Sequence, residues 1–312
     1  MRQINKTILA VVMGLLTIVN IPALAQSTDN ARFLSLSPPE GLPIIPVLEG
    51  WIANADGTTS FSYGIINRND VAVDIPLGNS NRVEPAKYNG MQPTHFPAGR
   101  STGVFTITLP PADQDIDVWW YLITGNSEEL KVPGRCCISA YELDFIRPRP
   151  QGSMQPMAGF GENGQQAAGL FAQTGSYSGR VTAGIPVTLT VNVSDPSVRD
   201  ATDPRFSEPF ALGVHFTKYQ GPGDVEFTLH ESTVVPENPY EEDDRRFAFF
   251  REPKPSDVQV EGGEGLARVI ATFSEPGDYM IETKIENFKA PDSSNGDQCC
   301  WTTIIQRINV TP

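Results

Sequence analysis

Short runs of alternating apolar and polar residues recur along this chain, and Gly and Pro separate them. In PVTLTVNV (186–193), Leu189 and Val191 fall on one face and Thr188 and Thr190 on the other. This two-residue period is typical of a β-strand that packs on one side. Runs of the same kind are TTSFSYGII (58–66), GVFTITL (103–109), DVWWYLIT (117–124), LARVIATF (266–273) and TTIIQRINV (302–310). Many short strands divided by turn residues predict an all-β fold of sandwiches or barrels.

The chain also divides into two halves of related plan. In each half an alternating strand, a Pro-containing corner and a second strand precede an adjacent pair of cysteines. We therefore predict two tandem domains, each closing with a strand that the cysteine pair opens. The stretch RPRPQGSMQPMAGFGENGQQAAG (147–169) is rich in Pro, Gly and Gln and predicts a linker. The expected division is a signal peptide 1–25, an N-terminal domain 26–148, a linker 149–177 and a C-terminal domain 178–312.

The second half resembles the bacterial Ig-like and PKD-type sandwich domains. The resemblance lies in AGIPVTLTVNVSDPS, VHFTKYQGPGDVEF and ATFSEPGDYMIETKI, although the WDFGDG-like turn of PKD domains is missing and Phe216 stands where a Trp is expected. The first half resembles uncharacterised exported bacterial proteins through DGTTSFSYGIINRND, VDIPLGNSNRVEPA and QPTHFPAGRSTGVFTI. The resemblance implies two Ig-like β-sandwiches, and it assigns no catalytic residue.

The first 25 residues have the features of a signal peptide. Arg2 and Lys6 precede an apolar run, and Ala23-Leu24-Ala25 forms a small–x–small cleavage pattern. The apolar run is shorter than the ~20 residues of a membrane-spanning helix. We therefore expect an exported protein, periplasmic or extracellular, without a membrane span. The net charge of −14 argues against nucleic acid as a partner.

All four cysteines occur as two adjacent pairs, Cys136–Cys137 and Cys299–Cys300. Exported proteins meet oxidising conditions, so we expect disulfides. Three connectivities are open: one bond within each pair, or either of two cross-linked arrangements between the pairs. Matching positions in two separate domains favour a bond within each pair. A bond between adjacent cysteines must fit a Cα separation of ~3.8 Å, shorter than the ~4.4–6.8 Å usual for disulfides, so it would be strained and redox-labile. Reactive thiols in these pairs would instead allow an alternative function in metal or redox chemistry.

No motif of an enzyme or of a cofactor site is complete. The catalytic patterns G-x-S-x-G and H-E-x-x-H do not occur. No His follows either cysteine pair at the short spacing that a blue-copper site requires. Asp113, Asp115 and Asp117 have the spacing that opens a calcium-binding EF-hand loop, but Val118 and Thr124 occupy the positions of its Gly and Glu. We expect a non-enzymatic protein without a cofactor, with calcium as the one ion left open.

Few residues are candidates for ligand binding. His95 lies near Arg100 in PTHFPAGR and is the best candidate for a functional imidazole. Trp119 and Tyr121 share the face of a predicted strand with Asp117, and these rings or Trp301 could stack on sugars. The leading interpretation is an exported binding, adhesion or structural protein of the cell envelope with an unknown protein or glycan partner. The alternatives are a carbohydrate-binding module and an exported metal or redox protein.

Overall fold

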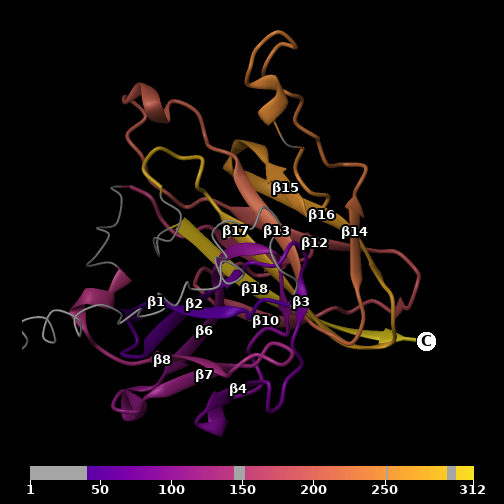
Figure 1. Ribbon diagram of the computed structural model, residues 1–312. Helices are drawn as coiled ribbons and strands as arrows, with labels where there is room; N and C mark the ends of the chain where they lie inside the picture. Colours follow the sequence, from indigo (N-terminus) through magenta and orange to yellow (C-terminus); the bar gives the residue numbers. More distant parts are fainter. Residues whose placement is uncertain (1–40, 144–151, 251, 294–299) are drawn as a thin grey trace, which may run out of the picture. The chain divides into compact units, whose positions relative to one another are not determined.

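The N-terminal half of the chain forms two three-stranded sheets with one apolar core between them. The structure, a computed structural model, describes residues 41–143, 152–250, 252–293 and 300–312. The strand orders are β1-β2-β6 and β4-β7-β8, and β3 pairs with β5 (Figure 1). The bounds are β1 (Ile45–Ala53), β2 (Thr59–Asn67), β3 (Val73–Asp74), β4 (Asn81–Glu84), β5 (His95–Phe96), β6 (Gly99–Leu109), β7 (Val118–Leu122) and β8 (Leu130–Gly134).

Strand β7 shows how the alternating pattern positions this core. Val118, Trp120 and Leu122 are at most 1% exposed and belong to the core cluster. The Trp120 Nε1 donates a hydrogen bond to Asn81 Oδ1 over 3.0 Å, so the buried indole keeps its N–H paired. Trp119 lies on the opposite face and is partly exposed.

The C-terminal half is a sandwich of two larger sheets. Their strand orders are β14-β16-β12-β9 and β10-β18-β17-β13-β15, and β11 also pairs with β18. In β12, Leu189, Val191 and Val193 are at most 2% exposed and confirm the predicted core face. The bounds are β9 (Met157–Phe160), β10 (Gln173–Ser176), β11 (Val181–Thr182), β12 (Val187–Ser194), β13 (Leu212–Gln220), β14 (Val225–Leu229), β15 (Asp257–Val260), β16 (Glu264–Phe273), β17 (Gly277–Glu286) and β18 (Trp301–Thr311).

The strand orders have the neighbour relations of an immunoglobulin-like sandwich. In that plan the first, second and fifth strands are neighbours in one sheet, and the third, sixth and seventh in the other. The second half repeats the plan with β9-β12-β16 and β13-β17-β18, and the first with β1-β2-β6 and β4-β7-β8. Tyr279, near the start of β17, donates its hydroxyl to the Glu275 carbonyl over 2.9 Å, which is the tyrosine corner of such domains. The all-β class is confirmed.

The two cysteine pairs do not occupy equivalent positions, which corrects one sequence expectation. Cys300 directly precedes β18, the last strand of its sheet. Cys136 and Cys137 instead follow β8, the last strand of the N-terminal sheet, and the 3₁₀ helix η5 (Ser139–Tyr141) comes next. The reason is local: the Val-Pro-Gly sequence ending β8 already pairs with β7, so the chain leaves the sheet before the pair.

Two strands lie inside the stretch expected to be a linker. β9 pairs with β12, and β10 runs parallel to β18. The sequence of β10, QTGS, has no apolar alternation. It joins the sheet through backbone pairing with β18, and Gln173 Nε2 also donates to the Ala158 carbonyl over 2.8 Å. The division of the chain into domains stays a prediction, and the expected signal peptide lies outside the described residues.

Short 3₁₀ helices complete the secondary structure. Within the described part of the chain, no helix has the length and apolar character needed to cross a membrane. The remaining bounds are η3 (Ala86–Tyr88), η4 (Pro111–Asp113), η6 (Pro204–Phe206), η7 (Phe247–Phe249) and η8 (Glu261–Gly263).

The two sandwiches are in direct contact within one compact unit, Glu40–Pro312. The Thr94 amide donates to the Tyr219 carbonyl over 2.8 Å. The Tyr219 hydroxyl donates to the Met91 carbonyl over 2.6 Å. A small apolar cluster of Ile52, Leu143, Leu170 and Trp301 also joins residues of both halves. These contacts cover part of the outer face of the sheet that contains β13 and β17.

Candidate functional site

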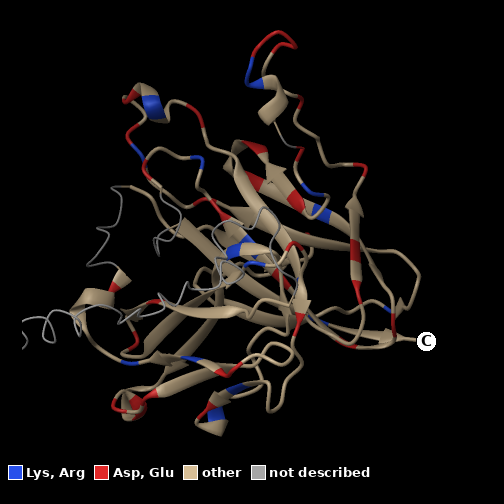
Figure 2. Ribbon diagram, viewed as in Figure 1, with Lys and Arg blue, Asp and Glu red and all other residues tan. Residues whose placement is uncertain are grey.

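A cavity of about 300 Å³ lies where strands β5 and β6 of the N-terminal half meet β13 and β17 of the C-terminal half. We call it the junction cavity. Acidic side chains outnumber basic ones in the chain, 37 to 23, and Figure 2 shows both kinds spread over strands and loops. The cavity departs from that balance, because most of its acidic, basic and imidazole lining residues are basic or imidazole: His95, Arg100, His215, Lys218, Glu282 and Lys284.

The register of β13 and β17 brings the C-terminal residues of this lining together. His215 lies opposite Lys284, and Thr217 lies opposite Glu282. Their sequence neighbours Ile281 and Ile285 are fully buried in the core of the sandwich. Since successive side chains of a strand point to opposite faces, Glu282 and Lys284 point away from that core and toward the N-terminal half.

The N-terminal half closes over Lys284. Its Nζ donates to the carbonyl oxygen of Thr102, at 2.7 Å, and lies 4.9 Å from the centroid of the Trp301 ring. Burial lowers the pKa of Lys284, although the charges of Glu282 and Glu49 oppose this effect. The ammonium is thus desolvated and has a backbone carbonyl as its hydrogen-bond acceptor.

Glu282 is the acidic group of the junction cavity. Its carboxyl group forms no hydrogen bond with any residue that the structure describes. It is partly exposed and lines the cavity, and burial raises its pKa to about 7 against the opposing charges of Lys284 and His215. A carboxyl group with such a pKa changes its charge near neutral pH.

His215 and Lys218 are each held by carboxylates. His215 Nδ1 lies 3.0 Å from Asp257 Oδ1, and its Nε2 lies 3.6 Å from Glu286 Oε1. Burial alone would lower the pKa of His215, but these two carboxylates raise it to about 9. Lys218, only 5% exposed, pairs with Asp74 over 3.1 Å.

The structure brings the predicted pair His95 and Arg100 together at this cavity. His95 Nδ1 lies 2.8 Å from Asp74 Oδ1, so one aspartate contacts both His95 and Lys218. Burial opposes ionisation of Asp74, but His95 and Lys218 outweigh it and lower the pKa of Asp74. Arg100 is exposed, and no described residue forms a hydrogen bond or ion pair with its guanidinium.

Sequence reasoning missed the C-terminal contributors His215, Lys218, Glu282 and Lys284. Along β17 every second residue forms a mostly polar row, Met280, Glu282, Lys284 and Glu286, which resembles the solvent-facing side of an ordinary strand. This row was a signal in the sequence. The sequence did not show that the N-terminal half covers it, because that contact joins residues far apart in the chain.

The aromatic face of Trp119 and Tyr121 lies outside the junction cavity and carries cations. Lys131 Nζ lies 4.8 Å from the Trp119 ring centroid, and Arg82 Cζ lies 4.0 Å from that of Tyr121. Tyr121 is 9% exposed, so these side chains occupy much of the surface that a sugar ring would stack on.

Trp301 is 1% exposed and offers no ring face to solvent. It packs against Gly103, where φ is +60° and a Cβ atom would come within 2.8 Å of the indole Nε1. The close approach therefore requires glycine.

The remaining predicted residues lie apart from the cavity lining. Cys136 and Cys137 are adjacent in a turn and Cys136 packs beside the N-terminal core, while Cys299 lies outside the described residues. The disulfides stay a prediction. Asp113 contacts Lys87, and Asp117 pairs with Arg135 over 2.6 Å, so these two carboxylates are engaged separately.

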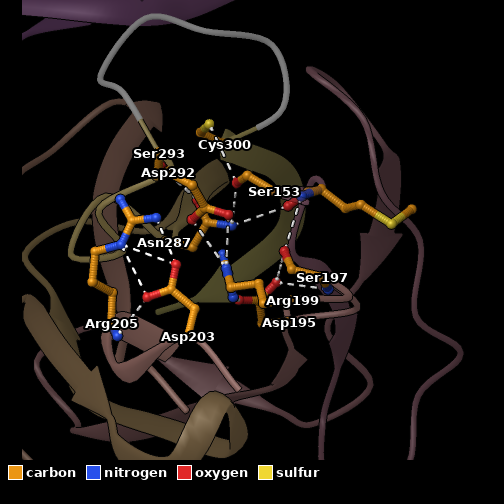
Figure 3. A network of polar contacts seen from close by, with 11 residues as sticks. Ser153, Asp195, Ser197, Arg199, Asp203, Arg205, Asn287, Asp292, Ser293 and Cys300 are labelled. Carbon is orange, nitrogen blue, oxygen red and sulfur yellow. Dashed lines mark hydrogen bonds and ion pairs between the residues drawn. The ribbon is translucent and has the colours of Figure 1, made fainter. Parts of the chain in front are cut away.

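A second polar cluster ties together loops of the C-terminal sandwich (Figure 3). Arg199, 10% exposed, donates through Nε to Asp292 over 3.0 Å and through Nη1 to Asp195 over 2.9 Å. Asp195 also accepts from the Ser197 hydroxyl, which itself accepts from the Met154 amide. The cluster connects the loops after β12 and β17 with the segment before β9, which is a structural role.

No protein-family model matches this chain, and no curated protein sequence matches it. Solved structures with partial similarity include the D0–D1 domain of intimin, with 13% identity, coverage of 86% of this chain and 97% of that chain, and a TM-score of 0.24. A putative membrane-anchored protein from Corynebacterium diphtheriae has 11% identity, coverage of 87% and 59%, and a TM-score of 0.25. CfaE, the adhesive subunit of CFA/I fimbria of enterotoxigenic Escherichia coli, has 10% identity, coverage of 86% and 88%, and a TM-score of 0.22.

Proposed function

We propose that this chain is an exported, non-enzymatic binding protein whose ligand occupies the junction cavity. The observation that carries the proposal is the cavity itself: about 300 Å³, lined by both halves, with Arg100 and Glu282 each lacking a hydrogen-bond partner among the described residues. Ligand sites are commonly concave, mostly preformed and located between domains, with a few polar groups directed into them. Ionisable groups with shifted pKa values are frequent in such sites.

Export rests on the predicted signal peptide, and the location, periplasmic or extracellular, is part of the same proposal. A binding role is favoured over an enzymatic one because the sequence lacks a complete catalytic motif. The cations over Trp119 and Tyr121 and the burial of Trp301 give a carbohydrate platform little support.

A cavity-filling substitution tests this proposal. Thr217 lines the cavity on β13, and Thr217→Phe would occupy the space that a ligand needs. Thr228 is exposed on β14, and Thr228→Phe is the matched control. We expect a library of small anionic, neutral and cationic molecules to contain compounds that raise the melting temperature of the mature protein and of Thr228→Phe, but not of Thr217→Phe. Equal responses of both variants, or no response of the mature protein, would overturn the proposal.

A further inference from the structure

The two basic groups of the junction cavity that lack a carboxylate partner indicate the charge of its ligand. Lys284 donates to a backbone carbonyl, and Arg100 forms no ion pair with a described residue. The other three, His95, Lys218 and His215, are already paired with acidic side chains. We propose that the cavity binds a small organic carboxylate with an apolar body, held through its carboxylate by Arg100 and Lys284. This inference rests on the proposed function of the same cavity.

The remaining lining suits the apolar body of such a ligand. Ile65, Phe96, Pro97 and Val104 form apolar parts of the wall next to the basic groups. Phe96 and Ile65 are at most 1% exposed, so this wall is anchored in the N-terminal core. A guanidinium can hold a carboxylate through two parallel hydrogen bonds, and an ammonium acts as a compact point charge. A volume of about 300 Å³ accommodates a ligand of one ring or a short chain.

Glu282 makes binding of a carboxylate depend on pH. The groups around it are His215, Thr217, Lys218 and Tyr219 on β13, Lys284 on β17, His95 on β5 and Arg100 on β6. Because burial raises the pKa of Glu282 to about 7, its carboxyl group is mostly neutral at pH 6 and mostly ionised at pH 8. The neutral form does not repel an anionic ligand, whereas the ionised form does. Carboxylate binding is therefore tighter at pH 6.

The same geometry disfavours a cationic ligand. Such a ligand could pair with ionised Glu282, but it would lie beside Lys284, Arg100 and charged His215. Like charges in a partly desolvated space repel more strongly than in water. A neutral ligand would leave the unpaired guanidinium of Arg100 without a charged partner.

Three probes of nearly equal size distinguish these cases: benzoate, benzamide and benzylamine. Calorimetric titration of the mature protein at pH 6 is expected to show binding of benzoate, with benzamide and benzylamine weaker by at least about tenfold. Arg100→Gln is expected to weaken benzoate by a similar factor. Arg180→Gln, an exposed arginine that does not line the cavity, is the control and leaves the affinity unchanged.

Titrations at two pH values test the role of Glu282. Benzoate is expected to bind about fivefold more weakly at pH 8 than at pH 6. Glu282→Gln removes this dependence, whereas His95→Asn, at another residue of the cavity lining, retains it. Binding of benzamide or benzylamine with equal or greater affinity, blocked by Thr217→Phe, would overturn the carboxylate inference and leave the binding function intact. Failure of all three probes and of the library at this cavity would overturn both.

Discussion

Replacing Glu282 with glutamine changes how the stability of the fold depends on pH. The pKa of Glu282 rises from an ordinary 4.5 to about 7, chiefly because of burial. Below pH 4.5 the carboxyl group is neutral in both the folded and the unfolded chain. Between pH 4.5 and about pH 7 the carboxyl group ionises in the unfolded chain but stays protonated in the folded protein, so the stability of the fold decreases as the pH rises. Above pH 7 the group is ionised in both states, and the folded protein carries the full free-energy cost of burying a charged carboxylate.

The magnitude follows from the same values. Each pKa unit corresponds to about 1.4 kcal/mol, so the rise from 4.5 to about 7 gives an upper limit of roughly 3 kcal/mol. Because Glu282 faces a cavity, water lowers the measured effect to about 1–2 kcal/mol. We therefore expect Glu282→Gln to be more stable than the unsubstituted protein by this amount at pH 8, with a much smaller difference at pH 5.

Urea unfolding at pH 5 and pH 8 measures both differences by linear extrapolation. Glu226→Gln, which removes an exposed carboxylate from β14, is the matched control and should shift stability by less than about 0.5 kcal/mol at either pH. The reasoning is refuted if Glu282→Gln is less stable than the unsubstituted protein at pH 8, or if the two proteins change in parallel between the two pH values.

Two further substitutions test other parts of the structure. Arg199→Met leaves two aspartates of 6% and 9% side-chain exposure without their cation and should lower the free energy of unfolding by about 3–5 kcal/mol in urea titrations. Arg205→Met, which removes a 68% exposed arginine from its ion pair with Asp203, should lower it by less than about 1 kcal/mol. Equal losses would contradict the role of the cluster. Tyr279→Phe removes a hydroxyl that donates to the Glu275 carbonyl and accepts from the Gly223 amide, so we expect a loss of about 1–3 kcal/mol in the same assay. Tyr177→Phe, whose hydroxyl makes one long 3.4 Å contact, should be near neutral, and a larger loss there than at Tyr279 would argue against the tyrosine corner.

Local alternation predicted those parts of the fold whose strands have one apolar face. It identified the core face of β12 and placed Trp119 and Tyr121 on one face of β7. It did not reveal β9, whose four residues MAGF are too few to show an alternating pattern. It also did not reveal β10, because its polar residues join the edge of the sheet through backbone groups that every residue carries. It misplaced the first cysteine pair, since the strand that closes the N-terminal sheet ends at Gly134, before that pair.

The candidate site was predictable only in its N-terminal part. His95 and Arg100 lie close in sequence, and local spacing was enough to single them out. Lys284 and Glu282 reach the same cavity from almost two hundred residues further along, through the register of β17 against β13 and the contact of β17 with the N-terminal half. A polar row on a strand reads as a solvent face, and only the tertiary contact shows that the face is covered.

A backbone amide chemical-shift titration of the mature protein with benzoate at pH 6 tests the central claim most directly. Our account predicts the largest changes at residues of the junction cavity, namely Arg100, Thr217, Glu282 and Lys284, with saturation at a single affinity. Changes centred instead on Trp119 and Tyr121, or on the loops around Arg199, would contradict it, as would the absence of any change at millimolar benzoate.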